Sequence, residues 1–396
     1  MAELVDGAVL AEPEEAPPNA GEPAGGRVRL GPEEAAHLCE RGRLEVRRDG
    51  KPLDYPALIR AAAALQPRFE VRYPVYRSLR LRGYRLAAGP RDFRLYKRGS
   101  GPGGGPSEAY VWALSEREPV ALGELAGVLT EATNVHKRLL LGMVDSEGDA
   151  TFYEARRPHL PEGKPAEIPP SEGVPAGSRV LVSHAAAAEA CEAAFFGRVE
   201  EGRLWLSRLE AAYLAGRGVL KLPAGNGIAT PPKRGWFQRR RVAERGAGGA
   251  DFQTRLAVYR DLRDRGLVAR TGFKFGAHFR VYSKWPARHS DYLVHVLAPD
   301  HVFTLEEMAR AVRLAQSVRK RLVFAHLEVT GPLQTAGTTP SVADETRGFP
   351  KGPARASDTA TRREGVAGEK PAPTGREGFR VERQQVRYME LRRERP

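Results

Sequence analysis

The chain has 396 residues, of which 41% are hydrophobic, and a formal net charge of +14. Its length suits two to four small domains, and its charge favours a nucleic-acid partner, or less often an anionic membrane surface, over a merely solvated basic surface. Cys39 and Cys191 lie far apart, which excludes a disulfide framework and argues against a structural zinc site. Because no apolar run approaches 18 residues and no basic segment opens the chain, we expect a cytoplasmic protein without membrane span or signal peptide.

The N-terminal part of the chain predicts a small module. Residues 1–25 are acidic and rich in proline, and we expect them to be flexible. Residues 26–68 are expected to form an α+β N-terminal module. It opens with a short alternating strand and an amphipathic helix in GRVRLGPEEAAHLCERGRLEV, residues 26–46.

A second module is predicted over residues 69–157. An amphipathic helix ends at Gly83, and the strand FRLY follows at 93–96. A further helix then runs into two apolar strands, which are joined by the tight turn DSEGD at 145–149.

The same series of elements is then repeated. After a proline-rich linker at 158–178, residues 179–250 predict a second N-terminal module, in which 202–222 is identical to 26–46 at ten of 21 positions. Residues 251–396 repeat the larger module. The fold expected is α+β, with two tandem units that each combine a small α+β module with a larger mixed-sheet module.

The repeat has one interruption, at 330–378. The last match before this segment, NVHKRLLL with SVRKRLVF, lies 183 residues apart, whereas the strands FYEARR and YMELRR lie 236 apart. The intervening residues are rich in Gly, Pro, Thr and Ala, so we expect a disordered insertion at a hairpin tip. The strand after it, VRYMELRR at 386–393, is expected to be an exposed edge that invites pairing with another chain.

Basic and aromatic residues are interleaved between Lys233 and Ser290, a segment that contains 15 Lys and Arg but only four Asp and Glu. Such a segment suits single-stranded or bulged RNA, whose bases can stack on aromatic rings. We expect Phe273 and Phe275, however, to be ordinary core residues of a strand.

Three side chains of the second copy could cleave RNA without a metal. Tyr282 ends the strand FRVY, His289 follows a broken loop, and Lys320 lies where a helix meets a strand. RNA carries its own nucleophile in the 2′-OH, so cleavage needs a base, an acid and a cation near the phosphorane. Only two carboxylates, Asp291 and Asp300, lie near this frame, which is too few for a two-metal site. We therefore expect no metal or cofactor.

Each of these residues also has a structural explanation, as a surface histidine, a packing tyrosine or a helix-end lysine. The recurrence of the frame distinguishes the two interpretations. The first copy keeps Tyr96 and Lys137 but has Ser107 where the second has His289. We therefore expect the first copy to be an inactive scaffold.

The run from YRDLRDRGL to SVRKRLVFA, residues 259–325, resembles the archaeal tRNA-intron (tRNA-splicing) endonucleases. The family pattern of a Tyr ending FR-x-Y, a His opening H-S-x-Y-L-V and a Lys in S-V-R-K falls on Tyr282, His289 and Lys320. More loosely, the whole chain resembles members with two fused units. The resemblance implies a homodimer that cuts precursor tRNA at a bulge–helix–bulge and leaves 2′,3′-cyclic phosphate and 5′-OH ends.

The resemblance also implies that arginines hold a bulged base. Arg313 matches one of them and Arg387 is a second candidate, while Arg280 and Lys284 are further candidates for RNA binding. The chain departs from the family at His278, where Asp is usual and where the first copy keeps Asp92. We expect His278 to be a surface residue on a strand edge.

Two other functions remain open. A non-catalytic RNA-binding or structural subunit would fit the first copy taken alone, but the three residues of the second copy argue against it. A basic DNA-binding protein is the other alternative, and the lack of a clear recognition helix in the sequence disfavours it.

Overall fold

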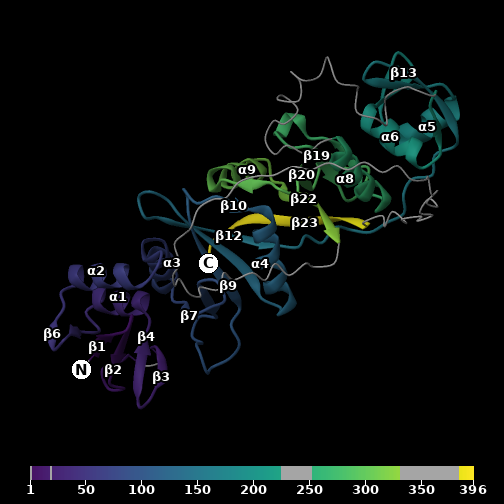
Figure 1. Ribbon diagram of the computed structural model, residues 1–396. Helices are drawn as coiled ribbons and strands as arrows, with labels where there is room; N and C mark the ends of the chain where they lie inside the picture. The colour runs from purple at the N-terminus through teal and green to yellow at the C-terminus, as the bar shows by residue number, and fades with distance from the viewer. Residues whose placement is uncertain (1, 18–19, 224–251, 331–382) are drawn as a thin grey trace, which may run out of the picture. The chain divides into compact units, whose positions relative to one another are not determined.

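The computed structural model describes residues 2–17, 20–223, 252–330 and 383–396. Its elements form two successive copies of one series, which can be followed by colour in Figure 1. Each copy has a small module of strands and helices followed by a larger mixed-sheet module, as the sequence predicts. Within the described ranges, no helix is both long and apolar enough to cross a bilayer.

The first N-terminal module is a six-stranded sheet whose core also takes residues from two helices. The strands are β1 (Ala2–Val5), β2 (Ala8–Ala11), β3 (Glu22–Ala24), β4 (Arg27–Leu30), β5 (Val46–Arg48) and β6 (Lys51–Pro52), and the helices are α1 (Pro32–Glu40) and α2 (Tyr55–Leu65).

The expectation of a flexible segment over 1–25 was wrong. Strands β1 and β2 form an antiparallel hairpin within this sheet, and Val9 and Ala11 are fully buried in its core. Each strand has only four residues, so neither gives a periodic signal against the acidic, proline-rich residues that follow. The N-terminal module therefore begins near residue 2 and not at 26.

The second N-terminal module has a five-stranded sheet. Its elements are β13 (Ser171–Ala176), β14 (Arg179–Val182), α5 (Ala185–Ala193), β15 (Arg198–Glu200), β16 (Arg203–Ser207), α6 (Arg208–Gly216) and β17 (Leu220–Lys221). The predicted linker, 158–178, is too long at its C-terminal end, because β13 pairs with both β14 and β17. The end of the predicted module falls in 224–251, outside the described residues.

The two larger modules match element by element. The first contains α3 (Phe69–Leu81), β7 (Arg85–Ala88), β8 (Phe93–Tyr96), β9 (Ala109–Ser115), β10 (Val120–Ala121), α4 (Leu122–Asn134), β11 (Arg138–Val144) and β12 (Ala150–Arg156). The second contains α8 (Phe252–Asp264), β18 (Val268–Thr271), the 3-10 turn η1 (Phe273–Phe275), β19 (Phe279–Tyr282), β20 (Tyr292–Val296), β21 (Val302–Phe303), α9 (Leu305–Ser317), β22 (Arg321–Thr330) and β23 (Arg383–Glu394).

Both modules share one ten-stranded sheet, in the order β18-β19-β20-β22-β23-β12-β11-β9-β8-β7. Within each module one strand pair is parallel, β9 with β11 and β20 with β22. The pairs β7 with β8, β8 with β9, β11 with β12, β18 with β19 and β19 with β20 are antiparallel. At the centre, β12 pairs antiparallel with β23. The expectation that the final strand is an exposed edge was therefore wrong, since the first copy of the repeat already occupies that edge.

Two buried carboxylates lie at this central junction. Glu390 accepts hydrogen bonds from Arg156 of the first module and Arg321 of the second. Glu154 is bound in the same way by Arg138 and Arg392. Burial opposes ionisation of Glu390, but the hydrogen bonds from Arg321 and Arg156 outweigh it and lower its pKa. The repeated arrangement ties the two modules together by an approximate two-fold relation.

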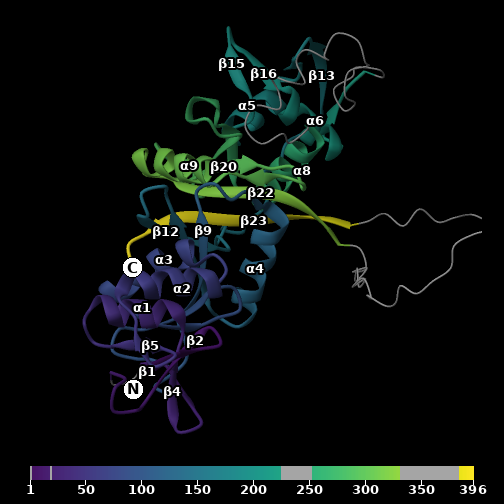
Figure 2. The same cartoon turned by 60° about the vertical axis from the view of Figure 1, so that its left-hand side comes forward.

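Strands β22 and β23 are neighbours in the sheet and lie side by side in Figures 1 and 2. Apart from Thr330, the predicted insertion at 330–378 falls in 331–382, outside the described residues. The adjacency of β22 and β23 agrees with the expectation that the two ends of this segment meet in a hairpin.

Candidate active site

The register of three strands places the candidate residues at one end of the sheet. Val281 of β19 lies opposite Tyr292 of β20, which lies opposite Arg321 of β22. The adjacent row of the sheet therefore contains Tyr282, Asp291 and Lys320, which lie one residue after Val281 and one residue before Tyr292 and Arg321. Strand pairing alone thus brings two of the three predicted residues, Tyr282 and Lys320, into one row of the sheet.

Tyr282 closes β19 and is only 7% exposed. Its ring lies edge-on to that of Trp285, with 5.4 Å between the ring centroids, and the guanidinium carbon of Arg280 lies 5.9 Å from its centroid. A ring held between neighbours in this way can adopt few orientations, which suits a residue that must present its hydroxyl to one atom.

His289 lies in the loop between β19 and β20, and its side chain is exposed. The loop is closed at its base by Asp291, whose carboxylate accepts hydrogen bonds from the backbone N–H and the hydroxyl of Ser283, at 2.8 and 2.7 Å. This closure keeps the start of the loop, next to Tyr282, close to its end, next to His289.

Lys320 follows Arg319, which has a left-handed backbone with φ of 56°, at the point where α9 turns into β22. Its ammonium donates a 3.0 Å hydrogen bond to the carbonyl of Ser290, the residue after His289. The same ammonium lies 5.7 Å from the ring centroid of Phe275. The structure therefore brings Lys320 to the loop that carries His289.

The first copy has the same framework, and it corrects one equivalence. Lys137 donates to the carbonyl of Ser107, as Lys320 does to that of Ser290. Ser107 is therefore the counterpart of Ser290, and the counterpart of His289 is Pro106. The expectation that paired Ser107 with His289 was wrong by one residue, because the two loops differ in length. The first copy still lacks an imidazole at this position.

His278 is not the surface residue that we expected. It is half-buried, and its Nδ1 accepts a 3.0 Å hydrogen bond from the backbone N–H of Val296. Asp92 makes the equivalent 2.8 Å bond to Ala113 in the first copy. Burial, with smaller contributions from His295 and Arg255, lowers the pKa of His278 to about 4. A neutral imidazole thus takes the place of a carboxylate as a structural acceptor.

The predicted RNA-binding residues are spread over several elements. Arg280 lies in β19 beside Tyr282, Lys284 is exposed in the loop after it, and Arg313 is exposed on α9. Arg387 of β23 is paired with Glu328 of β22 at 2.5 Å. Arg280 is therefore the candidate that the structure brings to Tyr282.

The expectation that Phe273 is a core residue was wrong. Its side chain is 85% exposed on η1, whereas Phe275 is half-buried against the core of the module. The local sequence gave a signal for a turn in Gly272 and Gly276, which flank the segment GFKFG. Two other aromatics of the basic segment, Trp236 and Phe237, lie outside the described residues.

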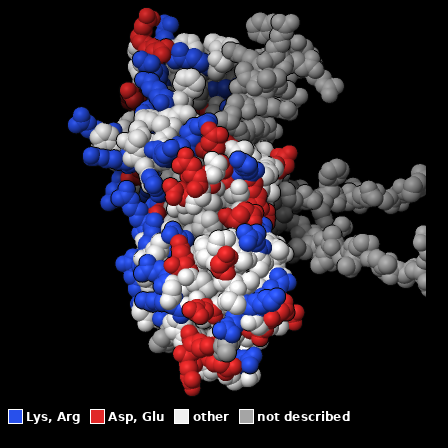
Figure 3. Space-filling view, turned by 90° about the vertical axis from the view of Figure 1, so that its left-hand side faces the viewer, with Lys and Arg blue, Asp and Glu red and all other residues white. Residues whose placement is uncertain are grey.

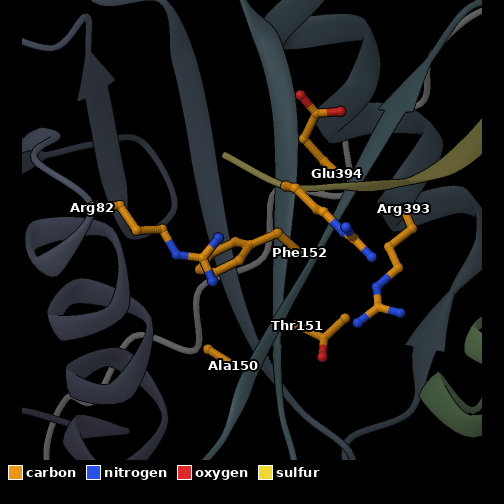
Figure 4. A pocket seen from close by; sticks show the side chains of 7 residues that line it. Arg82, Ala150, Thr151, Phe152, Arg393 and Glu394 are labelled. Atoms are coloured by element: carbon orange, nitrogen blue, oxygen red, sulfur yellow. The ribbon is translucent and has the colours of Figure 1, made fainter.

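The described ranges contain no group of three His, Cys, Asp or Glu side chains arranged to hold a metal ion. A cavity of about 200 Å³ lies where the first larger module meets the end of β23. It is lined by Arg82, Ala150, Thr151, Phe152, Arg393, Glu394 and Arg395, and Figure 4 shows the Arg82 guanidinium beside the Phe152 ring. None of the three candidate catalytic residues lines it. Charge is unevenly distributed, with Lys and Arg gathered along one margin of the face in Figure 3.

Comparison with known proteins matches both halves of the chain. The model of the tRNA intron endonuclease catalytic C-terminal domain matches residues 69–152 and 252–334, and that of the N-terminal domain matches residues 2–59 and 171–232. Both matches to the N-terminal domain begin where the structure starts these modules, at β1 and at β13.

Curated relatives match this chain along most of their length. The tRNA-splicing endonuclease of Methanococcoides burtonii is 39% identical over 320 residues, which cover 78% of this chain and 90% of that protein. Those of Methanosarcina acetivorans and Natronomonas pharaonis are 39% and 38% identical, over 77% of this chain and 88% and 87% of their own. With both domain types matched twice, the chain belongs to the tRNA intron endonuclease family and is an endonuclease.

Proposed function

We propose that this protein cleaves precursor tRNA at both intron boundaries, within a bulge–helix–bulge, and that the second unit alone performs the chemistry. The observation that carries the proposal is the convergence of Tyr282, the His289 loop and Lys320 at one end of the sheet. The relatives named tRNA-splicing endonuclease support the choice of substrate.

The arrangement suits an internal transesterification. The 2′-oxygen forms a bond to the adjacent phosphorus while the bond from phosphorus to the 5′-oxygen breaks. The Tyr282 oxygen accepts the proton of the 2′-OH, and the His289 imidazolium donates a proton to the leaving 5′-oxygen. Lys320, fixed by the Ser290 carbonyl, stabilises the charge on the phosphorane. The products are a 2′,3′-cyclic phosphate and a 5′-OH, with no metal in the reaction.

We further propose that the active form is a homodimer. Only one module of each chain carries the imidazole, whereas an intron has two boundaries, so two chains supply the two sites. The first unit then acts as a scaffold, in keeping with Pro106 at the position of His289. Because β23 is occupied within the chain, we expect the contact between chains to use another surface.

The test is incubation with an intron-containing precursor tRNA in EDTA, followed by mapping of the product ends. Cleavage at both boundaries with cyclic phosphate ends is expected, and His289→Ala should lower the rate about 10²–10⁴-fold while RNA binding persists. A strict Mg²⁺ requirement, or full activity of the variant, would contradict the mechanism. If the wild-type chain binds the RNA but never cuts it, the protein is instead a non-catalytic subunit.

A further inference from the structure

The second unit contains a longer turn than the first at the same place in the repeat. In the first unit, the backbone N–H of Gly89 donates to the carbonyl of Asp92, three residues later. In the second, the N–H of Gly272 donates to the carbonyl of His278, six residues later, at the same 3.1 Å. The same hydrogen bond thus closes both turns, and the one in the catalytic unit is three residues longer.

The longer turn holds an aromatic ring out in solvent. It contains the segment 273–275, Phe-Lys-Phe, and the Phe273 side chain is 85% exposed, while other exposed large apolar side chains in the described part of the chain reach at most 53%. A Cβ at Gly272 would lie 2.8 Å from the Ala277 carbonyl oxygen, so the turn is tightly closed at its base. A rigid turn that presents one phenyl ring is suited to binding a flat ligand.

The turn also lies beside the proposed catalytic lysine. Phe275, two residues after Phe273, packs on the core with its ring centroid 5.7 Å from the Lys320 ammonium. On its other side, a Cβ at Gly276 would be 3.7 Å from the Leu314 side chain, next to Arg313 on α9. The turn therefore bridges the candidate site and the helix that carries Arg313.

The exposed cations of the turn and of the elements next to it indicate the kind of ligand. Lys274 and Arg313 are exposed, and Arg319 is exposed on the loop that leads to Lys320. Cations around an exposed aromatic ring fit a polyanion with flat, unpaired bases, since the phosphates meet the cations and a base meets the ring. An apolar protein partner would leave these cations without a counter-charge.

We propose that Phe273 stacks on an unpaired base of the RNA substrate and so positions the nucleotide chain at the cleavage site. The inference rests on the proposed function and adds a specificity residue to it. The extra three residues occur only in the unit with His289, so the stacking residue and the catalytic residues are found in the same unit.

The experiment measures binding of a bulged RNA with 2-aminopurine in the bulge, in the His289→Ala background so that the RNA stays intact. Phe273→Ala should raise the dissociation constant about 5- to 150-fold, the effect of losing one stacked base. It should also abolish the fluorescence quenching of the stacked probe. Phe273→Trp should restore both. Leu81→Ala, an exposed apolar residue of α3, is the matched control and should change neither.

An unchanged dissociation constant and unchanged quenching in Phe273→Ala would overturn the proposal. The proposal would also be overturned if Phe273→Ala changed the mass of the assembly on light scattering and left RNA binding intact. That result would assign the Phe273 ring to a contact between protein chains. Failure of the proposed function has a different signature: a chain with the natural His289 would not cleave precursor tRNA, whatever Phe273→Ala does to binding. Circular dichroism checks that the variants fold, as expected for so exposed a side chain.

Discussion

Two residues of the second unit change a buried electrostatic arrangement that the first unit contains. In the first unit, Arg72 is held by Glu33 at 2.5 Å and by Asp92 at 2.6 Å. The repeat places Arg255 at the position of Arg72, with Leu209 and His278 at the positions of the two carboxylates. The Arg255 Nε is buried with no hydrogen-bond partner among the described residues. The second unit therefore keeps the cation, with a neutral acceptor in place of one anion and an apolar side chain in place of the other.

This arrangement predicts acid sensitivity. The pKa of His278 is lowered to about 4, chiefly by burial, so between pH 6.5 and 4 the unfolded chain binds a proton that the folded chain does not. The contribution of His278 to the free energy of unfolding is fully present above pH 6.5, and about 3 kcal/mol is lost as the pH drops to 4. His278→Asp should remove this loss, and urea midpoints of the two proteins should diverge between pH 7 and 5.

The reciprocal variant provides the control. Asp92→His should introduce into the first unit the same loss of stability on acidification, because it places a neutral imidazole beside Arg72. Parallel midpoints at all pH values for wild type and His278→Asp would show that His278 has no part in the pH dependence. His295 and His37, whose pKa values burial also lowers to about 4, would then be the next residues to test for any remaining loss.

The two copies of the candidate site make a second residue-scale prediction. Tyr96→Phe with Lys137→Ala alters the first copy and should leave the rate of single-turnover cleavage nearly unchanged, because that copy has Pro106 and no imidazole. Tyr282→Phe with Lys320→Ala should abolish cleavage. The loss of the Lys137 bond to Ser107 makes a thermal melt a necessary control for folding. Equal losses of rate in both double variants would mean that the first copy is catalytic.

At the scale of elements, the junction of β12 and β23 depends on its buried carboxylates. Glu390 is 2% exposed, so removing both of its cations leaves a buried charge without a partner. Arg156→Met with Arg321→Met should lower the free energy of unfolding by about 3–5 kcal/mol, measured in urea. Adding Glu390→Met should restore most of it, because an apolar group replaces the whole buried arrangement.

An exposed ion pair is the matched control for this prediction. Arg310 pairs with Glu306 on α9, with both side chains more than 70% exposed. Arg310→Met should therefore change the free energy of unfolding by less than about 1 kcal/mol. If the triple variant at the junction is no more stable than the double variant, the buried charge of Glu390 is not the cause of the loss. Deletion of 384–396 is expected to expose β12 and unfold the sheet, not to release intact monomers.

For the whole molecule, the proposed dimer has two catalytic units and two scaffold units. A mixed dimer of one wild-type chain and one His289→Ala chain, purified through two tags, should cut only one intron boundary of each bound precursor. Homodimers of wild type should cut both, and light scattering should give twice the mass of the chain. Cleavage of both boundaries within a single binding event of the mixed dimer would rule out one site per boundary.

The tandem repeat, the α+β class and the three candidate catalytic residues could all be predicted from the sequence. These follow from local signals: matching segments at fixed offsets, periodic apolar residues, and a Tyr, His and Lys in a recurring frame. The register of β19, β20 and β22 agrees with them because strand pairing brings the ends of consecutive elements together.

Only the tertiary structure decided which segments find partners far along the chain. The N-terminal hairpin is too short to be seen without the sheet that it joins, and β23 looks like an edge until β12 pairs with it. The burial of His278 and the exposure of Phe273 could not be predicted for the same physical reason. Both depend on neighbours from other elements, such as Val296 beside the imidazole, and not on local sequence.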